Sequence, residues 1–134
     1  AIKADSAALF PDSKTTSDFL TKYKSEHFEK YKKRANSRYT YTRPKLHKTD
    51  GDFENGITDI FDAMTGGVAH EQHRLPGHGY NYFRSQQNVA TEIFANVFAM
   101  YNGDSETKRR ARKLFPNLFG RMDEILKDYI DGKI

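Results

Sequence analysis

The run from Asn88 to Asn102 (NVATEIFANVFAMYN) constrains the fold more than any other part of the chain, because it contains a single charged residue, Glu92. Lys, Arg, Asp and Glu make up 30% of the 134 residues, so an almost uncharged run of this length is typical of a largely buried helix. A carboxylate in a buried helix needs an arginine, a histidine, a metal ion or backbone donors beside it. The nearest loop upstream carries His78, so we expect His78 and Glu92 to meet.

Helical geometry divides this run into two faces. At about 100° per residue, the large apolar side chains fall on one broad face, which consists of Ala90, Ile93, Phe94, Val97, Phe98 and Tyr101. The opposite face holds Glu92, Ala95 and Ala99. Its small side chains predict a close approach by another element, with Glu92 at the floor of the contact. The alternative is an exposed Glu92, or one that pairs with Arg84 or Arg74.

Composition limits the kinds of protein that this chain can be. One domain of 134 residues is long enough to bury a core, and a mean hydropathy of −0.85 describes a polar, soluble chain. No apolar run approaches the roughly 20 residues that span a membrane, and we expect no membrane partner. Because there is no cysteine, a metal would need histidine, carboxylate or carbonyl ligands, and disulfide scaffolds are excluded.

The periodicity of apolar residues predicts a mainly α fold, with α+β as the alternative, in a single compact domain of about five helices. We expect residues 1–14 to form a flexible lead or a docking arm, and residues 15–134 to form the helical domain. The helices are expected at about 16–35, 57–64, 88–101, 104–115 and 116–131. Gly66-Gly67 and Gly132 suit left-handed helix ends.

Two segments between the expected helices have patterns typical of a strand and of turns. Tyr39-Thr40-Tyr41-Thr42 alternates aromatic and β-branched residues, which predicts a short strand or strand pair near residues 38–43. Residues 44–56 contain Asp50-Gly51 and Asn55-Gly56, which predict turns.

The basic residues favour one possible function. The net charge is +4, and the positive side chains concentrate in residues 30–38 and 108–113. Two such runs could form a phosphate-binding face of a nucleic-acid-binding module. The side chains that would make it are Lys32, Lys33, Arg34, Arg109, Arg110 and Arg112. The simpler interpretation is that each run is the solvated side of an amphipathic helix.

The histidine loop offers a second possible function. His70, His73 and His78 together with Glu92 would form a zinc set, with Glu71 as the nearest general base. His70 and His73 are three residues apart, whereas the HExxH motif of zinc peptidases places its histidines four apart on a helix, so that motif is absent. The structural alternative is that His78 hydrogen-bonds Glu92 as a strut beneath a glycine turn.

Four short pieces of the chain, in order, resemble a known family. DIFDAMTGG, GHGYNYF, TEIFANVFAMYNGD and LFPNLFGRMDEIL are similar to a region toward the C-terminus of minor head (head-morphogenesis) proteins of tailed bacteriophages and prophages. The resemblance covers roughly Thr58 to Ile130, just over half of the chain. It implies a domain that is made in the cytoplasm of a bacterial host and then enters the virion, with other phage head or portal proteins as partners.

The ExFAxxF piece is also similar to the glutamate-bearing helix of lethal-factor-type zinc metallopeptidases, in which that glutamate binds the metal. This resemblance implies that Glu92 is a ligand, but the missing HExxH puts a working peptidase in doubt and points to a degenerate zincin-like domain. Our leading hypothesis is therefore a structural or interaction domain with a buried His–Glu site and no cofactor. The alternatives are a small zinc-dependent hydrolase and a nucleic-acid-binding module.

Overall fold

A computed structural model describes residues 1–28 and 48–133 of the chain. Within these ranges the protein has seven α-helices, one 3-10 helix and no strand, which confirms the mainly α prediction. The elements are α1 (Ile2–Leu9), α2 (Ser13–His27), α3 (Lys48–Met64), α4 (Val68–Glu71), the 3-10 helix η2 (Tyr82–Arg84), α5 (Gln86–Tyr101), α6 (Ser105–Leu114) and α7 (Pro116–Ile130). The strand expected near 38–43, and with it Lys32, Lys33 and Arg34, lies outside the described residues.

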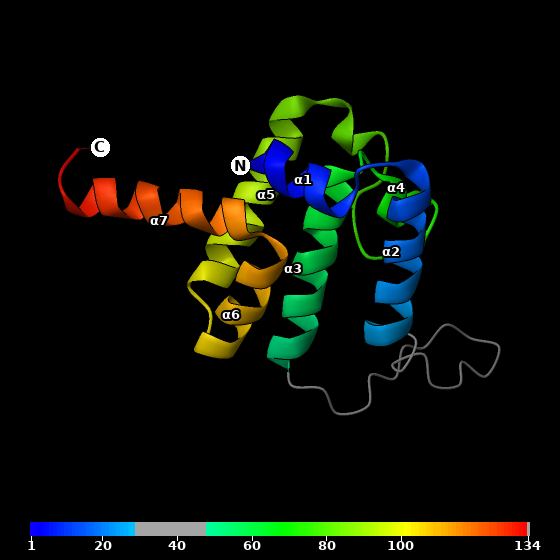
Figure 1. Cartoon of the computed structure of the whole chain (residues 1–134), viewed down its shortest axis with the longest axis horizontal. Coiled ribbons are helices and arrows are strands. Elements are labelled where there is room, and N and C mark those ends of the chain that lie inside the picture. Colours follow the sequence, from blue (N-terminus) through cyan, green and yellow to red (C-terminus); the bar gives the residue numbers. More distant parts are fainter. Residues whose placement is uncertain (29–47, 134) are drawn as a thin grey trace.

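Helix α3 runs through the middle of the body, between α2 and α6 (Figure 1). Its most extensive partner among the described helices is α5. Ile57, Ile60 and Phe61 recur at helical spacing on α3 and are fully buried, and they form the centre of the hydrophobic core with Ile93 and Val97 of α5. The pairing of these two helices fixes the positions of the polar residues that they carry.

Helix α3 begins much earlier than the sequence patterns indicated. The turns predicted at Asp50-Gly51 and Asn55-Gly56 are wrong, since both pairs lie inside a continuous helix. Buried Phe53 extends the apolar stripe of the helix upstream of Ile57. At Gly56 a Cβ would lie 3.4 Å from the side-chain oxygen of Asn96, so α3 and α5 are in close contact here. The predicted end of the helix is correct, because Gly66 and Gly67 adopt positive φ values of 65° and 101°.

Residues 1–14, expected to form a flexible lead or a docking arm, contain α1 and the start of α2. Asp5 anchors helix α1 to helix α7, and this residue is 1% exposed. Its carboxylate accepts hydrogen bonds from the backbone N–H of Asn117 (3.1 Å) and Leu118 (2.7 Å), and from the side-chain amide of Asn117 (2.8 Å). Asp5 thus caps the N-terminus of α7 from a position 112 residues away in the sequence.

Helix α7 extends beyond the rest of the described structure (Figure 1). Its first turns bury Leu118, Phe119 and Met122 in the core, whereas Tyr129 and Ile130 near its end are 69% and 81% exposed. In the described structure no element covers this end of the helix. None of the described helices combines the length and the apolar character needed to cross a membrane.

Candidate functional site: a polar cluster between α3, the histidine loop and α5

The face of α5 that points inward is not the one expected from its large apolar residues. Phe94 and Phe98 are 52% and 45% exposed and stack on each other with ring centroids 6.1 Å apart. Glu92 and Asn96 instead lie on the inner side, next to buried Ile93. The predicted division of α5 into two faces is therefore wrong, because Ala95 and Ala99 of the small-residue face are exposed. The expectation that Glu92 lies at the floor of a contact with another element is confirmed. Polar groups occupy the inner face because other elements supply partners for them.

Asp62 of α3 holds the histidine loop in place. Its fully buried carboxylate accepts hydrogen bonds from the backbone N–H of His70 (3.0 Å), His78 (2.7 Å) and Gly79 (3.0 Å). A Cβ on Gly77 would lie 2.2 Å from the Asp62 carboxylate, so only glycine fits at that point of the loop. The glycine-rich loop is thus shaped by the buried carboxylate of Asp62, which was not predicted from the sequence.

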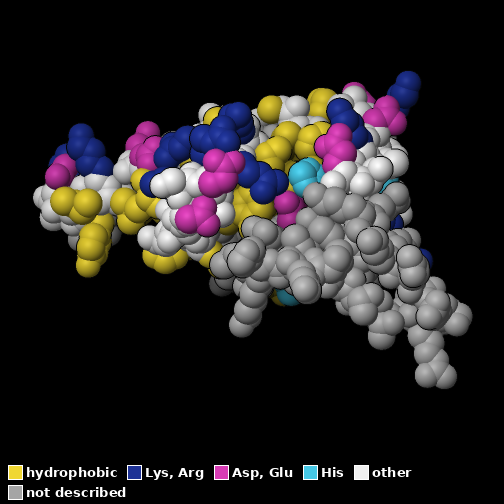
Figure 2. All heavy atoms as spheres, turned by 90° about the horizontal axis from the view of Figure 1, so that it is seen from below, with side chains coloured by type: hydrophobic (Ala, Val, Ile, Leu, Met, Phe, Trp, Pro, Cys, Tyr) yellow, Lys and Arg dark blue, Asp and Glu magenta, His cyan; other side chains and the backbone are white. Residues whose placement is uncertain are grey.

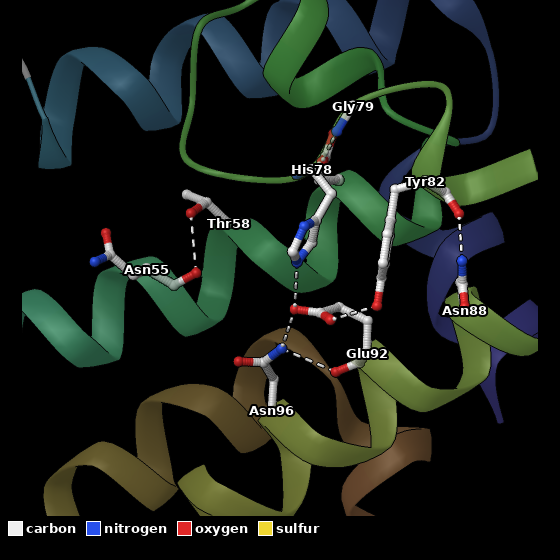
Figure 3. A network of polar contacts seen from close by, with 9 residues as sticks. Asn55, Thr58, His78, Gly79, Tyr82, Asn88, Glu92 and Asn96 are labelled. Carbon is white, nitrogen blue, oxygen red and sulfur yellow. Dashed lines mark hydrogen bonds and ion pairs between the residues drawn. The ribbon is translucent and has the colours of Figure 1, made fainter.

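Glu92 meets His78, as the sequence predicts (Figure 3). The His78 Nε2 atom lies 3.3 Å from Glu92 Oε1, with the two side chains 43% and 16% exposed. The Tyr82 hydroxyl donates to Glu92 Oε2 at 3.4 Å, and the Asn96 side-chain amide donates to Oε1 at 3.2 Å. The Glu92 carboxylate is therefore held from three sides, and neither Arg74 nor Arg84 pairs with it in the described structure.

Aromatic contacts fix the plane of the His78 ring. Tyr82 stacks on it with a centroid distance of 4.0 Å and an angle of 23°, and Phe83 meets it edge-on at 5.9 Å. Because Asp62 holds the backbone of His78 and the two aromatic rings hold its imidazole, the side chain is preorganised toward Glu92.

Asp59 is the third member of the cluster and was not predicted from the sequence. A carboxylate oxygen of Asp59, a ring nitrogen of His78 and a carboxylate oxygen of Glu92 all lie within 4.8 Å of one another. Burial, followed by the charge of Glu92, raises the pKa of Asp59 to about 6. The sequence pattern that could have identified Asp59 is the DIFD segment. It places Asp59 and Asp62 three residues apart on α3, the amphipathic helix that packs against α5.

The raised pKa of Asp59 makes stability depend on pH in a defined direction. The folded protein holds this proton more tightly than the unfolded chain, whose carboxyl titrates near its ordinary value of 3.8. The contribution of Asp59 to stability is therefore most favourable below about pH 4 and is lost as the pH rises through about 6.

The other residues predicted for a metal site lie apart from this cluster. The His70 ring faces the backbone oxygen of Leu75 at 2.9 Å, and His73 lines a pocket with Asp12 and neighbouring residues of α2. Glu71 is exposed, and its carboxylate lies against the backbone of Gly79. Among the described residues, the one group that could hold a metal ion consists of Asp59, His78 and Glu92, so the predicted set keeps two of its four ligands.

The arginines predicted to contact nucleic acid each have a carboxylate partner. Arg109 pairs with Glu106 at 2.7 Å, Arg110 with Glu54 at 3.2 Å, and Arg112 with Asp123 at 2.8 Å. These pairs reduce the positive charge that α6 can offer to phosphate groups. The structure therefore does not favour a nucleic-acid interface over the solvated helix face.

Comparison with known proteins identified no relative of this chain. No family description, no curated protein and no solved structure matches the chain.

Proposed function

We propose that this is a structural or interaction domain of a phage minor head protein, in which the polar cluster stabilises the histidine loop. Three of the four pieces that carry the family resemblance support this proposal because they build one region. DIFDAMTGG forms the end of α3 and its glycine stop, GHGYNYF is the histidine loop, and TEIFANVFAMYNGD is most of α5 and its C-terminal turn. Head or portal proteins would be its partners, in the cytoplasm of a bacterial host and later in the virion.

The observation that carries an interaction role is the exposure of large apolar side chains on α5 and on α7. Phe94, Phe98, Tyr129 and Ile130 are all large and 45% or more exposed. Hydrophobic side chains gather at the protruding end of α7, on the left of Figure 2. Exposed apolar groups of this size mark protein–protein contact sites when they cluster.

The test is co-expression of the chain with head and portal proteins of tailed bacteriophages, followed by size-exclusion chromatography with light scattering. We expect a complex that Tyr129→Ser with Ile130→Ser weakens at least tenfold, while the monomer keeps its melting temperature because both side chains are exposed. Lys127→Ser, on an exposed position of the same helix, is the matched control. No complex with any of these proteins, or equal loss in the control, would contradict the proposal.

A second candidate is a small zinc-dependent hydrolase, which the Asp59–His78–Glu92 cluster favours. A bound divalent ion would supply an activated water at such a site. His78 and Glu92 would hold the ion, and Tyr82, which donates to Glu92, would orient that ligand. Glu71, the base predicted from the sequence, is not part of the cluster. Zinc-dependent cleavage of a peptide library that Glu92→Gln abolishes would establish this activity, and absence of cleavage in zinc-loaded protein would remove it.

A further inference from the structure

We infer that Asp59, His78 and Glu92 form a binding site for a first-row divalent transition-metal ion such as Zn²⁺ or Mn²⁺. The inference concerns binding alone and rests on the same three residues as the hydrolase candidate, but it does not require any reaction. It is independent of the apolar surface on which the head-domain proposal rests.

The geometry of the three donors suits a single ion. They come from α3, from the histidine loop and from α5, and their ligand atoms already lie within 4.8 Å of one another. Ligands about 2.0 to 2.2 Å from a zinc ion are about 3 to 3.5 Å apart, so small side-chain adjustments would close the site. The His78 Nε2 atom and Glu92 Oε1 are already at 3.3 Å.

The charge of the cluster also calls for a cation. Asp59 and Glu92 bring two carboxylates together on packed helices, and in the described structure no lysine or arginine forms an ion pair with either of them. His78 is the one basic group in the cluster. Two partly buried carboxylates repel each other unless a proton or a cation lies between them. A divalent ion would neutralise both.

The donor set selects the class of ion. One imidazole and two carboxylates combine the ligand types that zinc and manganese accept, whereas calcium takes about six to eight oxygen ligands. His78 is 43% exposed, which leaves room for water to complete the coordination. Tyr82 and Asn96 donate to the Glu92 carboxylate and would orient it toward the ion.

The test is calorimetric titration of the whole, metal-stripped chain with zinc chloride and manganese chloride, together with thermal melting. We expect one ion per chain and a higher melting temperature in its presence. Asp59→Asn and Glu92→Gln keep the size of each side chain, and each is expected to weaken binding at least tenfold. His73→Ala, which removes a histidine outside the cluster, should bind as the unaltered protein does.

Two outcomes would overturn the inference: no saturable binding of either ion, or binding that His73→Ala weakens as much as Asp59→Asn does. Circular dichroism of each variant without metal shows whether a loss of binding reflects a loss of fold. Stoichiometric binding without peptide cleavage would support the site and end the hydrolase candidate. Failure to bind metal would leave the head-domain proposal untouched.

Discussion

Asp62→Ala is expected to lower the free energy of unfolding by about 3 to 5 kcal/mol, because it removes a buried acceptor from three backbone N–H groups. That loss is a large fraction of the total stability of a domain of this size, about 5 to 15 kcal/mol. Without the carboxylate, the amides of His70, His78 and Gly79 would be left without their partner, and the loop would detach from α3. Urea denaturation followed by circular dichroism measures the change.

Asp18→Ala is the matched control for this substitution, because Asp18 lies on the exposed side of α2. We expect the control to change stability by less than about 0.5 kcal/mol. If Asp62→Ala costs no more than Asp18→Ala, Asp62 does not hold the loop, and the position assigned to His78 is wrong.

Asp5→Ala is expected to cost about 2 to 3 kcal/mol, because a single carboxylate caps the N-terminus of α7 through Asn117 and Leu118. The substitution should also release α1, since this cap joins the two helices. Denaturation measures the stability, and proteolysis followed by mass spectrometry detects release of the N-terminal residues.

Asp12→Ala provides a comparison within the same chain. Asp12 caps its own helix, α2, at an exposed position by accepting from the backbone N–H of Thr15 at 2.7 Å. We expect this local cap to be worth about 1 kcal/mol, no more than half of the effect at Asp5. Equal losses at the two positions would show that α1 is not fastened to α7 in the way described.

The parts of the fold that were predictable are those with local causes. Asp104 and Pro116 mark the starts of α6 and α7, and Gly66-Gly67 marks the end of α3, because caps, proline and left-handed glycine act within one turn. The burial of Asp5 was not predictable, since its partners are 112 and 113 residues away in the sequence. The number of helices was underestimated because α1 and α4 lie in segments for which no helix was predicted, and α3 was predicted too short because its glycines were taken as turn signals.

The candidate site was half predictable for a related reason. The sequence indicated the contact between His78 and Glu92, because an almost uncharged helix must find a partner for its one charge. It did not indicate Asp59 or Asp62, since their roles depend on how α3 packs against α5. It also misassigned the inner face of α5, because hydrophobicity alone favours Phe94 and Phe98, whereas the available polar partners place Glu92 inside.

The most direct test of the polar cluster is an NMR titration of the Asp59 side-chain carboxyl in the metal-free protein. We expect a pKa of about 6, with burial as the first cause and the nearby Glu92 charge as the second. Glu92→Gln removes that charge, so the pKa of Asp59 should fall, yet stay above its ordinary value of 3.8 because burial persists. An Asp59 pKa near 4 in the unaltered protein, unmoved by Glu92→Gln, would contradict the account, because the two carboxyls would then not lie together.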